Sequence, residues 1–139
     1  MAVQTIATLK SNMPIGTAGG TSVQDIHDIV DTMEDMTTQT VVAKTASYAD
    51  TTADNRRFFT MSVGSANTFT VPSAAPAGWE CAVMQIGAGQ TTIAVGGTGA
   101  LRHPSGHTKV SGQYAVVYLK VYANAGTAPQ VAFTGDTAA

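Results

Sequence analysis

Residues 113–122 read QYAVVYLKVY, the longest stretch of alternating character in this chain of 139 residues. Side chains of a strand alternate between its two faces. One face would carry Ala115, Val117, Leu119 and Val121, which predicts a core face. The other would carry Tyr114, Val116, Tyr118, Lys120 and Tyr122. Its three tyrosines, Tyr114, Tyr118 and Tyr122, are suited either to contact with another chain or to a partly covered sheet surface.

Further short runs rich in Val, Thr, Phe and Tyr surround this strand, and Gly, Pro and Asn separate them. They predict strands at 40–45, 56–63, 68–71, 81–86, 91–95 and 130–134. Short, closely spaced strands favour an antiparallel β-sandwich or barrel, here over residues 38–139. The glycine stretches 87–89 and 96–99 are interpreted as hairpin turns, where glycine permits positive φ.

Residues 22–37 carry the clearest helical pattern. Ser22 is a good N-cap, and Asp25 three residues later resembles a capping box. An apolar stripe with helical spacing follows: Val23, Ile26, Val30 and Met33. The stripe is too short for an autonomous coiled coil, so the helix is expected to pack on another surface, and these four residues are candidate oligomer contacts. Its acidic polar face is interpreted as solvated or as facing a basic neighbour.

Residues 1–21 contain Pro14 and a glycine-rich segment at 16–20, which predict an extended arm. No signal peptide and no apolar run of ~20 residues is visible, so we expect a protein made in the cytoplasm without a membrane partner. The charged fraction is 12% and the formal net charge is −2. Basic clusters beyond Arg56-Arg57 are missing, which argues against nucleic acid as a partner.

The chemistry-bearing residues form no familiar catalytic or metal-binding pattern. His103 and His107 flank a turn with no third ligand nearby, so we expect exposed histidines and no zinc site. Cys81 lies within a strand and is predicted to be a buried, unreactive thiol. The acids outside the helix are scattered through the β region: Asp50, Asp54, Glu80 and Asp136. We therefore expect a protein that is not an enzyme and has no cofactor.

The segment from Tyr48 to Asp136 resembles a module of tailed-bacteriophage virion proteins. The resemblance rests on FTVP at 69–72 with PAGW at 76–79, VMQIGAGQTTI at 83–93, and GQYAVVYL at 112–119 leading to VAFTGD at 131–136. It implies a homotrimeric head-fibre or capsid decoration protein, located on the virion, with the major capsid protein or another virion protein as partner. The helix at 22–37 is similar to head-fibre attachment segments.

This resemblance assigns the arm to the capsid shell, with a set of apolar anchor candidates: Val3, Ile6, Leu9, Met13 and Ile15. The alternative is a tail-fibre or adaptor module that binds a host-surface glycan. In that case Tyr114, Tyr118, Tyr122 and Trp79 would be the sugar-stacking rings. The resemblance implies no catalytic residue.

Overall fold

The computed structural model describes residues 38–139, of which Thr40–Ala139 form one compact unit. The predicted arm at 1–21, the predicted helix at 22–37, every anchor candidate and the four contact candidates of the helix lie outside the described residues.

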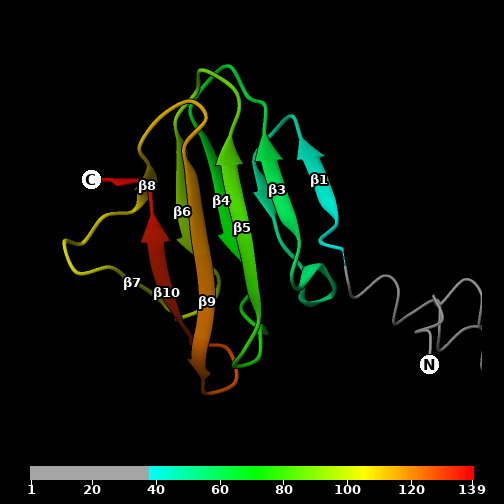
Figure 1. The fold of residues 1–139 in the computed structure, drawn as a ribbon. Helices are drawn as coiled ribbons and strands as arrows, with labels where there is room; N and C mark the ends of the chain where they lie inside the picture. Colours follow the sequence, from blue (N-terminus) through cyan, green and yellow to red (C-terminus); the bar gives the residue numbers. More distant parts are fainter. Residues whose placement is uncertain (1–37) are drawn as a thin grey trace, which may run out of the picture. The chain divides into compact units, whose positions relative to one another are not determined.

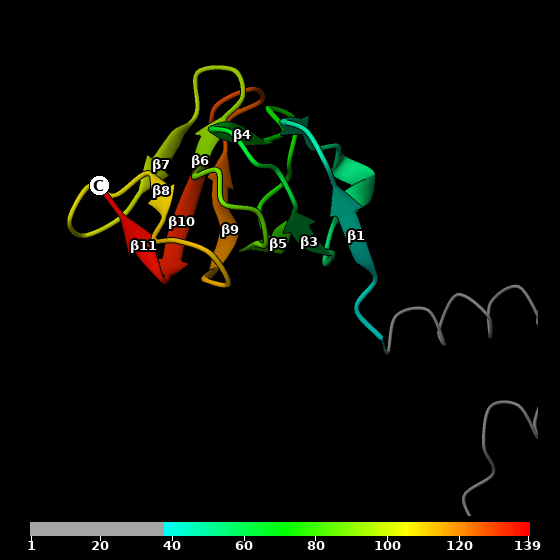
Figure 2. The same cartoon turned by 90° about the horizontal axis from the view of Figure 1, so that it is seen from above.

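The described chain is mainly β, with eleven strands and one short 3-10 helix. In chain order the elements are β1 (Val41–Lys44), β2 (Tyr48–Ala49), η1 (Thr52–Asp54), β3 (Phe58–Met61), β4 (Asn67–Val71), β5 (Glu80–Gln85), β6 (Thr91–Val95), β7 (Ala100–Arg102), β8 (Lys109–Val110), β9 (Val116–Asn124), β10 (Pro129–Gly135) and β11 (Thr137–Ala138). A six-stranded sheet has the order β1-β3-β5-β9-β10-β7, and a five-stranded sheet the order β11-β8-β6-β4-β2 (Figures 1 and 2).

All seven predicted strands are present, with boundaries shifted by a few residues. The strands that the sequence did not reveal are β2, β7, β8 and β11. Each has only two or three residues, too few to show an alternating pattern.

The prediction of an antiparallel fold was wrong, because both sheets are mixed and neither closes into a barrel. The first six strands alternate between the sheets: β1, β3 and β5 pair in parallel in one, and β2, β4 and β6 in the other. The chain thus winds as a coil of three turns. Phe58 and its partner Ala82 are as far apart in the sequence as Phe69 and its partner Ile93. The last two turns of the coil therefore stack in register.

The later strands join this coil through antiparallel pairs, and β7 pairs with β10 in parallel. β9 pairs with β5 and forms a hairpin with β10, while β8 pairs with β6. The hairpin turn contains Gly126, whose φ of 86° is a backbone conformation that glycine adopts readily. The predicted hairpin at 96–99 is absent, because this stretch joins β6 to β7 and these strands belong to different sheets.

The glycines at 87 and 89 have a different role from the one predicted. They join β5 to β6 across the two sheets, and neither has a positive φ. A Cβ at Gly87 would collide with the backbone of Val63, and one at Gly89 with the backbone of Ser65. Their amides donate hydrogen bonds to the carbonyls of Met61 and Val63. Glycine is required here because one crossing of the coil lies directly on the previous one.

Buried polar side chains fasten the same two crossings together. Gln85 accepts a hydrogen bond from the Thr91 amide (3.1 Å) and donates one to the Gly87 carbonyl (3.2 Å). The Thr91 hydroxyl donates to Asn67 Oδ1 (2.8 Å), and Asn67 Nδ2 donates to the carbonyls of Ser65 and Gly89. Each of these side chains is at most 5% exposed, so each needs its partners within the protein.

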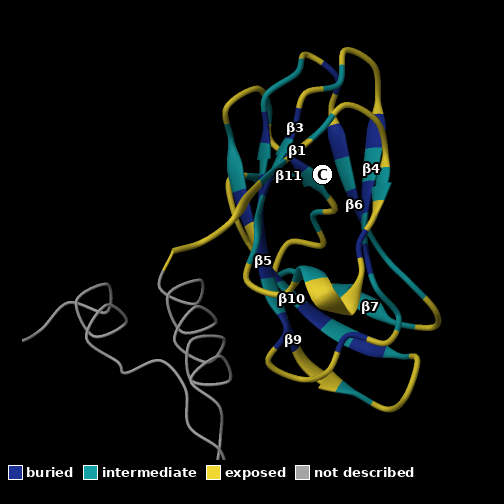
Figure 3. Cartoon of the chain, turned by 90° about the vertical axis from the view of Figure 1, so that its right-hand side faces the viewer, coloured by how far each residue is buried: buried dark blue, intermediate teal, exposed yellow. Residues whose placement is uncertain are grey.

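One apolar core joins the two sheets, as the burial colours in Figure 3 show. Phe59 of β3 packs against Phe69 of β4 with ring centroids 4.9 Å apart. Val117, Leu119 and Val121 of β9 are at most 1% exposed, which confirms the predicted core face. The large side chains of Trp79 and Phe133 are buried in the same core.

Replacing Gly89 by alanine tests the stacking of the two crossings. The new methyl group would overlap the Ser65 backbone, so we expect Gly89→Ala to lower the free energy of unfolding by about 2 kcal/mol. Gly64→Ala is the matched control, since a Cβ there meets nothing within 4 Å. Urea denaturation measures both. Equal stabilities of the two variants would contradict the close approach.

Candidate functional site

Two of the three predicted tyrosines lie on the outer face of the six-stranded sheet. Tyr118 and Tyr122 in β9 are each 56% exposed, which confirms that this face of the strand is not core. Tyr114 is exposed but lies outside the strand, contrary to the prediction. Its φ is 67°, and the amide of Ala115 donates to the Gly112 carbonyl, so the chain turns here and β9 begins at Val116.

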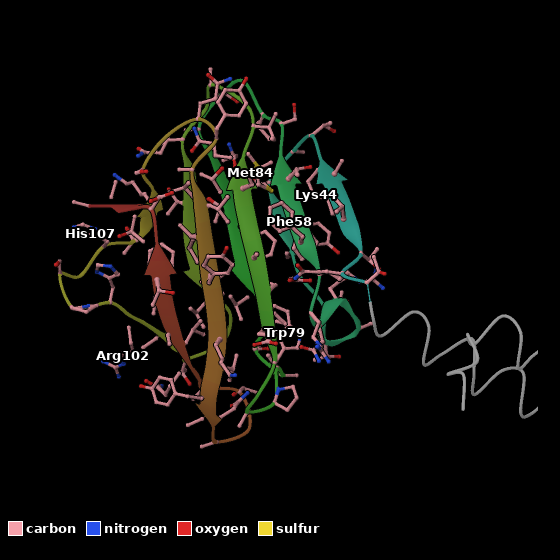
Figure 4. The ribbon with its side chains drawn as sticks, viewed as in Figure 1. Lys44, Phe58, Trp79, Met84, Arg102 and His107 are labelled. Atoms are coloured by element: carbon pink, nitrogen blue, oxygen red, sulfur yellow. The ribbon has the colours of Figure 1, made fainter. Side chains whose placement is uncertain are left out.

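Strand register extends this face into a wider apolar surface. Tyr118 is level with Ala82, Ala82 with Phe58, and Phe58 with Val41. The next row contains Val116, Met84, Thr60 and Ala43. Partnered residues project from the same face of a sheet. We call these eight residues, seven of them apolar and the eighth Thr60, the apolar band; Figure 4 labels Phe58 and Met84 within it.

Exposure within the apolar band is highest at its ends. Val41 is 64% exposed and Tyr118 56%, whereas Phe58 and Met84 are half-buried and Ala82 between them is only 2% exposed. Beside the band, Lys120 Nζ lies 3.5 Å from Glu80 Oε2 in an exposed ion pair. The sequence pattern indicates only the β9 part of this surface. The faces of Phe58 and Met84 and the strands that lie beside β9 are decided by the tertiary structure and not by the local sequence pattern.

A second cluster forms at the first turn of the coil, where two of the supposedly scattered acids come together. Asp54 Oδ2 accepts hydrogen bonds from the hydroxyls of Tyr48 (2.8 Å) and Thr51 (2.9 Å). Asp54 Oδ1 lies 3.3 Å from Arg57 Nε. Asp50 is 6% exposed, and its Oδ1 accepts a hydrogen bond from the Thr51 amide (2.8 Å). The 3-10 turn η1 brings Asp50 and Asp54 close together.

The two carboxyl groups hold their protons very differently. Burial raises the pKa of Asp50 to about 8, and its hydrogen bond to Asp54 acts in the same direction. Desolvation also acts on Asp54, but hydrogen bonds from Asp50, Tyr48 and Thr51 outweigh it and lower the pKa of Asp54 to about 2. A protonated and an ionised carboxyl could serve as acid and base. Here Asp50 is buried, so the pair is interpreted as a structural link between β2 and β3.

The third cluster contains the two histidines, which are half-buried and not exposed as predicted. The turn at 103–107 stacks the two rings, with centroids 4.6 Å apart and planes 8° from parallel. Thr137 Oγ1 lies 3.0 Å from His103 Nε2 and 2.9 Å from His107 Nδ1. Figure 4 shows His107 beside the loop between β7 and β8.

The remaining candidates are buried or isolated. Cys81 is 4% exposed, which confirms its predicted burial, and this burial raises the pKa of its thiol. Trp79 is 2% exposed and therefore cannot stack on a sugar, contrary to the glycan hypothesis. Within residues 38–139, no three His, Cys, Asp or Glu side chains gather as a metal site would require. No helix in this part of the chain is long and apolar enough to cross a membrane.

Comparison with known proteins yields no family model, no curated protein and no solved structure that matches the chain.

Replacing Asp50 by asparagine tests the carboxyl pair. Asp50 binds its proton more tightly in the folded protein, with a pKa of about 8, than at its ordinary value of 3.8. Its contribution to stability is therefore full below pH 4 and is lost as the pH rises to 8. Relative to Asp50→Asn, which keeps the acceptor for the Thr51 amide, we expect the natural protein to lose about 1 kcal/mol per pH unit between pH 5 and 8.

Urea denaturation across this pH range gives the difference between the two stability profiles. Asp54 stays ionised throughout, because its pKa is about 2. Asp136→Asn at an exposed position is the control and should run parallel to the natural protein. Parallel profiles for Asp50→Asn as well would show that Asp50 is ionised in the fold.

Proposed function

We propose that this chain is a non-enzymatic structural protein of a bacteriophage virion, a capsid decoration or head-fibre protein that assembles as a homotrimer on the capsid surface. The observation that supports assembly is the apolar band. The resemblance of residues 48–136 to virion modules supports the location on a phage particle.

The apolar band is a costly surface for a monomer in water. It runs across β1, β3, β5 and β9, and its end residues Val41 and Tyr118 are more than half exposed. Burying apolar surface stabilises a complex by roughly 25 cal/mol per Å². Exposed apolar patches of this kind mark contact sites between proteins. The core of a single copy is small, because the chain has few large side chains. Burial of the apolar band against other copies would enlarge it.

The proposed attachment to the capsid rests on avidity. Three copies of the 1–21 segment on one trimer would bind a symmetric lattice far more tightly than one, because the second and third contacts form at a high effective concentration. The partner is then a repeating shell protein. The helix at 22–37 would contribute contacts between copies through the stripe described above.

A matched pair of threonine substitutions tests the role of the apolar band. Thr60 lies within the band, and Thr68 is an equally half-buried threonine of the five-stranded sheet. A lysine at position 60 would place a charge in the contact between copies, so we expect Thr60→Lys to weaken self-association at least tenfold. Thr68→Lys should leave it unchanged. Sedimentation equilibrium measures the association of both variants.

Capsids assembled without this chain provide the test of attachment. The natural protein should co-sediment with them, and Thr60→Lys should bind markedly more weakly, because it loses avidity. A natural protein that stays monomeric and never binds such capsids would contradict the proposal. Thermal unfolding followed by circular dichroism separates loss of association from loss of fold.

The alternative function is glycan binding by a tail-fibre or adaptor module. It is favoured by the exposed rings of Tyr114, Tyr118 and Tyr122, since aromatic faces stack on sugars. Trp79 no longer contributes, because it is buried.

A glycan array probed with residues 1–139 tests this alternative. If the tyrosines bind sugar, Tyr122→Ser should abolish array binding, because it removes a stacking ring outside the apolar band, and self-association should persist. Thr134→Ser, on the exposed part of β10, removes no ring and is the control that should leave array binding unchanged. Absence of binding by the natural protein would exclude the alternative.

A further inference from the structure

The part of the six-stranded sheet that lies beyond the apolar band carries two cations on its outer face. Arg102 of the edge strand β7 is level with Ala132 of β10, and Ala132 is level with Lys120 of β9. Both cations are exposed, and so is Tyr122, which follows Lys120 by two residues on the same face. We call Arg102, Lys120, Tyr122, Gln130 and Ala132 the cationic patch. None of these residues belongs to the apolar band.

The guanidinium of Arg102 is oriented by a neighbouring side chain. Its Nε and Nη2 both donate to Gln130 Oε1, at 3.0 and 2.7 Å. These bonds use two of the five N–H donors of arginine. The other three lie on Nη1 and Nη2, which together form a fork that matches a carboxylate. Within residues 38–139 no carboxylate forms a salt bridge with Arg102.

Lys120 supplies a second positive charge on the other side of Ala132. Two strand spacings of about 4.8 Å each separate Lys120 from Arg102, and the short side chain of Ala132 lies between them. One anionic group above Ala132 is therefore within reach of both long side chains. Lys120 Nζ lies 3.5 Å from Glu80 Oε2, but these side chains are 62% and 43% exposed. Such an exposed ion pair contributes little, so Lys120 exchanges Glu80 for a ligand carboxylate at small cost.

Tyr122 adds an aromatic ring beside the two cations. It is 56% exposed, and a tyrosine ring offers an apolar face with a polar tip. The cationic patch therefore matches a ligand that combines a carboxylate with a rigid apolar face. A sugar ring that bears a carboxylate has both features, because its C–H face stacks on an aromatic ring. An acidic peptide supplies the charge without that rigid face.

We propose that the cationic patch binds a saccharide that carries a carboxylate. Arg102 receives the carboxylate through its fork, Lys120 neutralises the charge, and Tyr122 stacks on the sugar ring. The proposal rests on the glycan-binding alternative described above and names the class of its ligand. Assembly uses the apolar band, so self-association and saccharide binding depend on different halves of the same sheet (Figure 4 labels Arg102).

Isothermal titration calorimetry on the full chain tests the proposal with two acidic probes, trigalacturonic acid and sialyllactose. The methyl ester of each probe is the matched ligand, because it keeps the sugar rings and removes the charge. We expect each acid that binds to do so about tenfold more tightly than its ester, since charge-assisted hydrogen bonds are the stronger ones. Absence of binding by both acids, or equal binding of acid and ester, would overturn the proposal. A triglutamate peptide that binds as tightly as the acidic saccharides would also overturn it.

Two substitutions that remove one positive charge each locate the site. Arg102→Gln removes the fork, so we expect about tenfold weaker binding of the acidic saccharides. Lys109→Gln, in β8 of the other sheet, is the matched control and should bind as the natural protein does. Equal affinities of these two variants would contradict a site at Arg102. Sedimentation equilibrium should show unchanged self-association of Arg102→Gln, which separates failure of this site from failure of assembly.

Glu80→Gln should change the affinity in the opposite direction. It removes the carboxylate that competes for Lys120, so we expect binding of the acidic saccharides to become about twofold tighter. Binding of the methyl esters should stay as it is in the natural protein. Weaker binding of the acids by Glu80→Gln would show that Lys120 does not receive the ligand carboxylate.

Discussion

The close approach of two chain crossings is the constraint on which the rest of the fold depends. The turn carrying Gly87 and Gly89 lies on the backbone of Val63 and Ser65, at a distance that admits no Cβ. Gln85 and Asn67 then satisfy backbone groups of the crossing, and the Thr91 hydroxyl donates to Asn67 Oδ1. Because both crossings follow the same path, the strands on either side must pair in parallel: β3 with β5 and β4 with β6.

This coil has two consequences for the surface. It places β1, β3 and β5 side by side in one sheet, which brings their outward apolar residues into line with β9 and creates the apolar band. It also leaves open edges at opposite ends of the sheets, with β1 and β2 at one end and β7 and β11 at the other (Figure 2). Edge strands invite pairing with other chains, and natural proteins protect them. Here each end carries a cluster of titratable side chains.

The two clusters are built from different side chains. At the β2 end the buried Asp50 has a raised pKa, because ionisation in a desolvated position is unfavourable. At the β11 end two stacked imidazoles both lie within hydrogen-bonding distance of Thr137 Oγ1. Asp50 is buried, and His103 has hydrogen-bond partners at both ring nitrogens.

The sequence by itself determined the faces of β9, the positions of seven strands and the burial of Cys81, because side-chain alternation and turn residues act over a few neighbouring positions. Only the tertiary structure decided which strands pair and in which direction, since backbone hydrogen bonds carry no side-chain signal. For the same reason it decided that Gly87 and Gly89 mark a crossing and not a hairpin. Two clusters also depend on the tertiary structure. The turn η1 brings Asp50 close to Asp54, and the pairing of β11 with β8 brings Thr137 to the two histidines.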